Sequence, residues 1–298
     1  MPTSTIKLNY SNNSPIVVGH RGARNIAPEN TLESIKAALN LRLAAIEFDV
    51  TYTKDRAAVI VHQETVQPDF NTHSLKLAGR EAARLWAFEH TLEEIRSLDA
   101  GGWHAQKFRG VKVPTLEEIF SLNWGESYAV MELIDPSYWI EPVGSGDNTV
   151  ARTITQIVRP EVESFLTRGG NLFVLSFNPK LLAIWQAEFS GIPRILAVWT
   201  NENGNATRVI EQARCLGVHA VTLADSMVLE DPAWLKLCRK AGIRCWVYEV
   251  TPDNEKDFYS WSAESRKSTW EKLIRVGVDG IESDFPDVLQ QWTDTKFR

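Results

Sequence analysis

Titratable side chains interrupt several apolar stretches of this 298-residue sequence. Glu47 and Asp49 alternate with apolar residues, so in a β-strand both carboxylates would project from one face. Glu132 interrupts another apolar stretch in the same way. Like charges held together are costly unless a cation joins them, and carboxylate oxygens are the ligands that Mg²⁺ and Ca²⁺ prefer. The three carboxylates are therefore candidate ligands of one divalent cation, Ca²⁺ or Mg²⁺, with Mn²⁺ and Zn²⁺ as alternatives.

Two histidines end apolar stretches as well. His20 follows residues 16–19 and is itself followed by Arg21 and Gly22, while His62 follows residues 57–61. Imidazole titrates near neutral pH, so a histidine can both accept and donate a proton during a reaction. A single histidine or carboxylate of this kind could be structural, hydrogen-bonded or ion-paired. The occurrence of two histidines and three carboxylates together favours an active site.

Short β-rich runs alternate with helical patterns along the sequence. This alternation predicts the strands and helices that position these residues. The predicted strands cover residues 15–19, 44–50, 57–62, 128–133, 172–177, 194–198, 220–223, 244–250 and 280–283. We expect the run 57–62 to extend or pair with the strand before it, which leaves eight βα units. Eight units favour closure into a (β/α)₈ TIM barrel over an open doubly wound sheet. In such a barrel the carboxyl ends of the strands meet at one mouth, where active sites lie.

Residues 64–113 break the alternation. They are mixed and polar, with one helical stretch at 92–98 and a glycine-rich turn at 101–103. A segment of this length between barrel units is usually a functional cap. We therefore predict a single TIM-barrel domain over residues 1–298, with a small insertion subdomain after the second strand.

Composition excludes several classes of protein. The net charge is −6 and there is no run of Lys and Arg, so nucleic acid is not an expected partner. The three cysteines, Cys215, Cys238 and Cys245, have no repeated spacing and predict buried, reduced thiols. No apolar run reaches the roughly 18 residues of a membrane span, and the N-terminus has no apolar signal core. These features predict a cytoplasmic protein with a small-molecule substrate; they leave the oligomeric state open.

Several motifs together resemble the signature of the glycerophosphodiester phosphodiesterase family. The resemblance spans roughly residues 15–292 and is most specific in the N-terminal half. Its motifs are His20-Arg21-Gly22, Pro28-Glu29-Asn30-Thr31, Glu47-x-Asp49-Val50, Thr53-Lys54-Asp55, Val61-His62, the segments 98–103 and 113–118, Ser176-Phe177, Trp246 and the segment 277–287. The resemblance implies a TIM barrel with an inserted subdomain that hydrolyses a small phosphodiester to an alcohol and a phosphomonoester.

The resemblance also implies roles for individual residues. The family's metal ligands correspond to the three carboxylates named above, and its acid/base pair corresponds to the two histidines. Arg21 is similar to its phosphate-contacting arginine, and Trp246 to an aromatic residue at its mouth. The implied reaction is attack on phosphorus by a neighbouring substrate hydroxyl or by water. Which histidine acts as the base is left open.

Three departures from the family pattern predict a modified substrate pocket. Gln63 replaces an aspartate, Ile134 replaces a phosphate-binding lysine, and Glu249 stands where the family has asparagine. Glu249 could repel an anion or bind sugar hydroxyls, so a sugar phosphodiester such as an agrocinopine is an alternative to a glycerophosphodiester. Four aromatic residues of the insertion either line such a pocket or form the core of a lid: Trp86, Phe88, Trp103 and Phe108.

Two other functions compete with hydrolysis. The change at Ile134 would fit a non-catalytic phosphodiester-binding barrel, but the five titratable residues are intact. A lyase or transferase that forms a cyclic phosphate, resembling the sphingomyelinase D branch, is the other alternative. The long insertion and the motif 28–31 favour hydrolysis.

Overall fold

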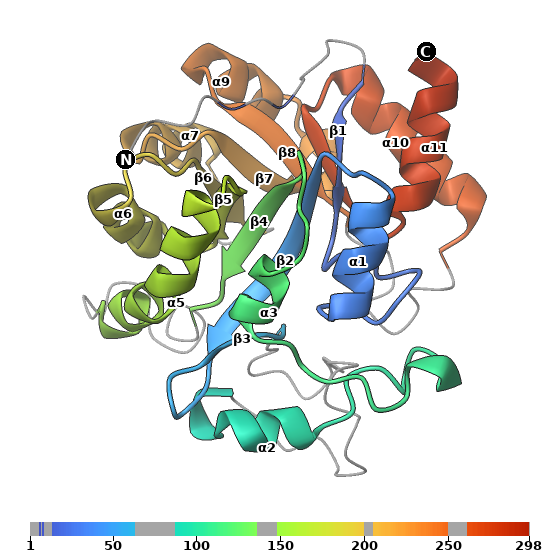
Figure 1. Cartoon of the computed structure of the whole chain (residues 1–298). Helices are drawn as coiled ribbons and strands as arrows, with labels where there is room; N and C mark the ends of the chain where they lie inside the picture. Colours follow the sequence, from blue (N-terminus) through green and yellow to red (C-terminus); the bar gives the residue numbers. More distant parts are fainter. Residues whose placement is uncertain are drawn as a thin grey trace.

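Eight parallel strands close into a barrel, which confirms the predicted TIM-barrel fold (Figure 1). The computed structural model describes residues 6, 8, 14–62, 87–135, 148–199, 205–249 and 261–297. The strand order is β1-β9-β8-β7-β6-β5-β4-β2, and β2 pairs with β1 to complete the circle. The strands are β1 (Ile16–Gly19), β2 (Ala45–Tyr52), β4 (Tyr128–Leu133), β5 (Asn171–Ser176), β6 (Arg194–Val198), β7 (Ala220–Ala224), β8 (Arg244–Tyr248) and β9 (Gly280–Ser283).

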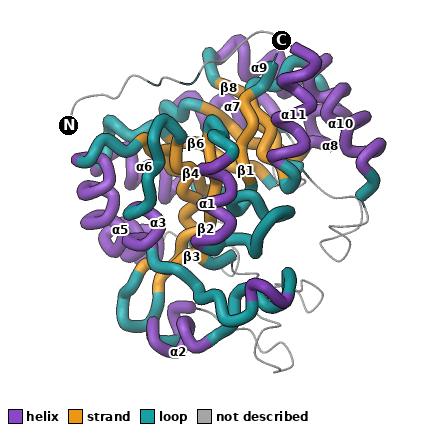
Figure 2. Tube along the Cα trace, turned by 45° about the vertical axis from the view of Figure 1, so that its right-hand side comes forward, coloured by secondary structure: helices purple, strands orange, loops and turns teal. Residues whose placement is uncertain are grey.

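Helices surround the barrel on its outside (Figure 2). Several begin at a residue whose side chain accepts a backbone N–H, such as Thr31, Thr115 and Asn178. At Thr115 the side chain of Glu118 completes a capping box. The helices are α1 (Leu32–Asn40), α3 (Leu116–Phe120), α5 (Thr149–Thr167), α6 (Pro179–Glu188), α7 (Ala206–Cys215), α8 (Asp225–Glu230), α9 (Ala233–Ala241), α10 (Ala263–Val276) and α11 (Pro286–Phe297).

Alternation along each strand divides the core in two. Outward-facing residues such as Ile46 and Phe48 pack against the helices in one large cluster. Inward-facing residues such as Val130, Phe173 and Trp246 fill the interior of the barrel in a second cluster. Because successive side chains of a strand point to opposite faces, the residues between the outward-facing ones must point into the barrel. This alternation aims Glu47 and Asp49 inward.

The short strand β3 (Ala58–Ile60) lies outside the parallel barrel. It pairs antiparallel with β2, with Ile60 opposite Val50. The chain therefore runs back along β2 after a turn, and the backbone N–H of Val61 donates to the carbonyl of Asp49 at 3.1 Å. The predicted run 57–62 pairs with β2 rather than extending it, and the reversal returns His62 to the level of the β2 carboxylates.

The described part of the insertion, residues 87–113, lies beside β3 at the bottom of Figure 1. It contains α2 (Leu92–Ser97) between two single turns of 3-10 helix, Ala87–Glu89 and Gln106–Phe108. Ile95 and Val113 join a small apolar cluster with residues of β3 and its end. The insertion thus has apolar contacts of its own, which attach it to β3.

Aromatic residues of the insertion pack against other rings of the insertion and against β2. The ring of His104 lies 5.4 Å from that of Trp103 and 5.3 Å from that of Phe108, and Phe88 lies 6.3 Å from Tyr52. Trp86 lies outside the described residues. These contacts favour the second of the two alternatives, in which the aromatic side chains form the core of a lid.

The three cysteines are free thiols. Cys238 and Cys245 are buried as predicted, whereas Cys215 is exposed at the end of α7, which corrects the expectation that all three are buried. Within the described ranges, none of the helices combines the length and the apolar character needed to cross a lipid bilayer.

Candidate active site

Three carboxylates meet at the mouth of the barrel. Glu47 and Asp49 come from β2, and Glu132 comes from β4, where it pairs in register with Asp49. One oxygen of each lies within 4.8 Å of the others. Burial raises the pKa of Glu47 and of Glu132 well above the ordinary value, and the neighbouring carboxylates raise both further. The structure brings the three predicted metal ligands together.

The cluster fits a divalent cation. Glu47 is 1% exposed, and its Oε1 atom has no hydrogen-bond partner in the part of the chain that the structure describes. A buried carboxylate oxygen without a donor is costly, and a hard cation would supply the missing partner. Oxygen ligands alone suit Ca²⁺ or Mg²⁺ better than softer metals.

A fourth carboxylate, Glu282 of β9, was not predicted as a site residue. It is 5% exposed, and its Oε1 atom lies 3.7 Å from His20 Nε2. Burial raises its pKa to about 7 despite the attraction of His20, and Asp49 adds to the rise. Its position between the outward-facing Ile281 and Ser283 was the available signal, because alternation directs such a residue into the barrel.

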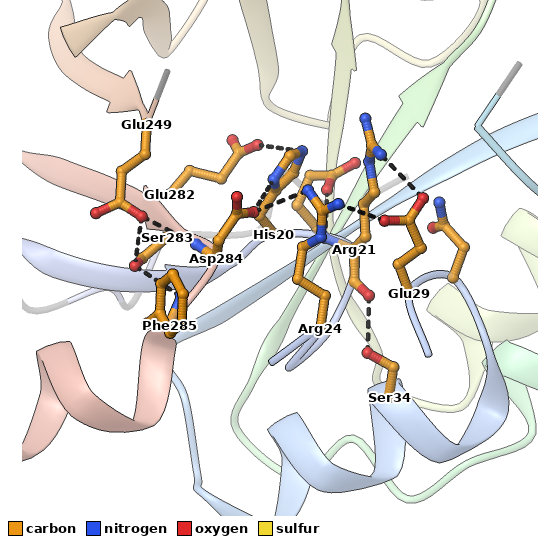
Figure 3. Close-up of polar contacts among 12 residues, drawn as sticks. His20, Arg21, Arg24, Glu29, Ser34, Glu249, Glu282, Ser283, Asp284 and Phe285 are labelled. Carbon is orange, nitrogen blue, oxygen red and sulfur yellow. Dashed lines mark hydrogen bonds and ion pairs between the residues drawn. The ribbon is translucent and has the colours of Figure 1, made fainter. Parts of the chain in front are cut away.

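His20 is held by a buried aspartate (Figure 3). Its Nδ1 atom lies 2.6 Å from Oδ1 of Asp284, which also accepts from Arg24 at 3.1 Å. Burial alone would raise the pKa of Asp284, but Arg24 and His20 outweigh it and hold the pKa well below its usual range. The ionised carboxylate accepts the Nδ1–H bond. This leaves Nε2 facing Glu282 and available for a proton.

Arg21 is placed by a turn that requires an unusual backbone. Arg21 and Gly22 have φ values of 52° and 88°. A Cβ atom at position 22 would overlap Ser34, so only glycine fits there. The turn directs the backbone N–H of Arg21 to Glu47 Oε2 at 2.8 Å, and the Arg21 Nε atom lies 3.3 Å from Asp49. The arginine thus reaches the carboxylate cluster with both its backbone and its side chain.

Glu29 joins the two arginines of this turn. It accepts from Arg21 Nη1 at 2.9 Å and from Arg24 Nη2 at 2.6 Å (Figure 3). Its burial favours a high pKa, but Arg21 and Arg24 lower it to about 2, and His62 and His20 contribute in the same direction. His20 directly follows β1, and His62 lies just beyond the end of β3.

Asn30 supports the metal cluster. The side-chain Nδ2 of Asn30 donates to Asp49 Oδ2 at 2.7 Å, and the side-chain Oδ1 accepts the backbone N–H of Asp49 at 3.1 Å. Asn30 does not cap α1, because Thr31 does so. Sequence reasoning singled out neither Asn30 nor Glu29 as a site residue, although both lie in the motif 28–31.

Trp246 occupies a different place from the one expected. It was expected at the mouth, but it is fully buried inside the barrel, 5.6 Å from the ring of Phe173. It pairs in register with Gly280, the first residue of β9, while the active-site residues lie at the other ends of the strands. Trp246 therefore fills the barrel below the site.

Glu249 was expected to face the substrate. The structure shows its carboxylate accepting from Trp270 Nε1, from Ser283 Oγ at 2.7 Å and from the backbone N–H of Asp284 at 3.0 Å. Burial raises its pKa to about 7, and Asp284 adds to the rise. With both oxygens engaged by the chain, Glu249 supports the loop that carries Asp284 (Figure 3).

Comparison with known proteins agrees with this geometry. The model of the Glycerophosphoryl diester phosphodiesterase family matches residues 20–288. A glycerophosphodiester phosphodiesterase of Caldanaerobacter subterraneus is 27% identical over 274 residues, which cover 92% of this chain and 96% of that protein. One of Bacillus subtilis is 22% identical over 285 residues, covering 93% and 85% of the two chains.

Solved structures share the fold. A phosphodiesterase of Oleispira antarctica, in complex with the product sn-glycerol-3-phosphate, superposes with a TM-score of 0.69 at 23% identity and covers 94% of this chain and 97% of its own. A glycerophosphodiester phosphodiesterase of Parabacteroides distasonis gives 0.66 at 20% identity, covering 97% and 100%.

The TIM-barrel fold and the match to the model of this family define a phosphoric diester hydrolase of the TIM-barrel class. The chain belongs to the glycerophosphoryl diester phosphodiesterase family, as the match over residues 20–288 establishes.

Proposed function

We propose that the protein hydrolyses a glycerophosphodiester to an alcohol and a phosphomonoester, with one divalent cation held by Glu47, Asp49 and Glu132. The observation that carries this proposal is the meeting of these three carboxylates, of which Glu47 and Asp49 are buried, with His20, whose ring is oriented by Asp284. When bound, a cation at this cluster would offset the negative charge of the phosphoryl oxygens. Ca²⁺ and Mg²⁺ are the ions that the oxygen ligands favour.

The chain's own groups perform the remaining tasks. Arg21 lies beside Asp49, with its Nε atom 3.3 Å from that carboxylate, and its guanidinium can donate to a phosphoryl oxygen. His20 and His62 share the two proton transfers. One takes the proton of the attacking water or substrate hydroxyl, and the other protonates the leaving oxygen. The Asp284 carboxylate keeps the His20 Nε2 atom turned toward the cluster.

The departure at Ile134 alters the surroundings of the site but leaves these groups in place. Ile134 is buried, and its backbone N–H donates to the carbonyl of Val50 at 3.0 Å. A non-catalytic barrel would need no oriented histidine beside a carboxylate cluster. This pairing favours catalysis over simple binding.

The test is product formation from sn-glycero-3-phosphodiesters, with and without EDTA. We expect release of a phosphomonoester that EDTA abolishes and added Ca²⁺ or Mg²⁺ restores. Phosphorus NMR of the product separates hydrolysis from formation of a cyclic phosphate. Lack of turnover after metal reconstitution would overturn the proposal, and turnover unaffected by EDTA would remove the cation from it.

A further inference from the structure

Three aromatic residues line a part of the mouth that the reaction above does not use. Phe177 directly follows β5, Trp199 directly follows β6, and Tyr248 is the last residue of β8. The centroid of the Phe177 ring lies 6.1 Å from that of Trp199 and 6.4 Å from that of Tyr248, at interplanar angles of 68° and 74°. Trp199 and Tyr248 lie 6.5 Å apart and within 15° of parallel. We call this set the aromatic corner.

The aromatic corner is accessible. Trp199 is 43% exposed, one of two large hydrophobic residues so exposed in the described part of the chain. Tyr248 is held in place because its hydroxyl donates to the carbonyl of Val198 at 3.0 Å. Together with its two neighbours, the exposed ring of Trp199 offers an aromatic surface to a substrate at the mouth of the barrel.

Carboxylates lie beside the aromatic corner, because Tyr248 pairs in register with Glu282 and with Ala224, the residue before Asp225. Burial raises the pKa of Tyr248 above its ordinary value, and the charges of Glu282, Glu132 and Asp225 add to the rise. Glu282 is 5% exposed, and its Oε2 atom has no hydrogen-bond partner among the described residues. Its other oxygen, Oε1, faces His20 Nε2 at 3.7 Å, and Glu282 is not one of the three carboxylates assigned to the cation. The corner thus combines ring faces with negative charge.

We propose that the aromatic corner binds the alcohol group of the substrate and selects alcohols that carry a positive charge, such as an ammonium or trimethylammonium group. Aromatic faces attract cations through their quadrupole, and a nearby carboxylate adds to the attraction. A neutral polyol would stack on the rings but gain nothing from the charge of Glu282 and Asp225. The inference rests on the proposed hydrolysis and names the specificity of the same site.

The experiment compares two substrates that differ only in charge. They are sn-glycero-3-phosphocholine and its neutral isostere, in which a 3,3-dimethylbutyl group replaces the trimethylammonium-ethyl group. We expect the wild-type protein to prefer the cationic substrate in kcat/KM by about 3- to 30-fold. Trp199→Leu keeps an apolar side chain but removes the ring, and should reduce this preference to about twofold or less. Turnover of the neutral substrate should change less.

Two controls accompany this variant. Trp199→Phe retains a ring and should retain most of the preference, whereas Trp292→Leu makes the same exchange on α11, away from the mouth, and should leave it unchanged. Phe177→Leu tests a second ring of the corner independently, in case Trp199→Leu does not fold.

The outcomes separate the two proposals. Equal kcat/KM for both substrates in the wild-type protein, or a preference that survives the loss of the Trp199 and Phe177 rings, overturns the cationic subsite. A stronger preference for glycerophosphoinositol would replace it with a polyol subsite. Absence of turnover of every substrate overturns the proposed hydrolysis instead, and calorimetric binding of the same charged and neutral pair then decides the subsite.

Discussion

The mouth of this barrel has two unlike halves. The half formed by β1, β2, β4 and β9 carries ionisable side chains that are buried or half-buried and lie close to one another. The half formed by β5, β6 and β8 carries the aromatic corner, in which Trp199 is exposed. Groups that transfer protons or hold a cation must be fixed within a fraction of an ångström, whereas a surface that selects one end of a substrate tolerates variation. In the two proposals above, the ionisable half serves the reaction and the aromatic half serves selection.

Removing a ligand from the ionisable half should have the largest effect. Glu47→Gln should lower kcat/KM by about 10⁴-fold, because a cation at the cluster contributes several kcal/mol to charge stabilisation. Metal content by elemental analysis should fall in the same variant. Asp231→Asn, a change at an exposed carboxylate at the end of α8, is the matched control. Full metal occupancy in Glu47→Gln would contradict the assignment.

Loss of either histidine should be the next largest effect. His20→Ala and His62→Ala should each lower kcat by about 10²–10⁴-fold, the usual contribution of a general acid or base. Steady-state kinetics with the cation at saturation measures it. His90→Ala, in the insertion next to α2, should stay within about twofold of wild type. Near-normal activity in either of the first two variants would remove that histidine from the mechanism.

Glu249 should make stability depend on pH. Its pKa is about 7 in the folded protein against an ordinary 4.5, so between these values the folded state holds more protons than the unfolded state. The protonated carboxyl of Glu249 therefore adds on the order of 3 kcal/mol to the free energy of unfolding. This stabilisation is complete below about pH 4.5 and is lost as pH rises through 7. Urea unfolding in EDTA at several pH values should show a shallower decline for Glu249→Gln than for wild type. Equal slopes would show that Glu249 titrates normally.

The smallest effect should come from the aromatic half. Trp199→Leu should change the free energy of unfolding by less than about 1 kcal/mol, because the side chain is 43% exposed. Trp185→Leu, a change at a fully buried tryptophan of α6, should cost several times more. Chemical denaturation of both variants measures the difference. A large loss of stability in Trp199→Leu would make Trp199 a packing residue rather than a selective one.

The barrel and the metal cluster were predictable because both follow from short-range periodicity. A period of two along residues 45–50 was enough to pair Glu47 with Asp49 and to turn both toward the interior. Glu282 obeys the same rule, and the alternation in its strand could have revealed it.

The remaining site residues depend on contacts that periodicity does not encode. The role of Asp284 follows from its contact with His20, 264 residues away in the sequence, and Asn30 contacts Asp49 through a loop. Alternation gives the side of the sheet on which a residue lies but not its height in the barrel. For this reason Trp246 was expected at the mouth although it lies well below it.

The first and last strands lie side by side, and this arrangement has a consequence for synthesis of the protein. His20 and Arg24 emerge from the ribosome 264 and 260 residues before their partner Asp284. Contacts so distant in sequence form late in folding. A nascent chain should therefore remain catalytically silent until β9 and Asp284 have been made, and a product truncated before β9 should lack activity even where most of its helices have formed.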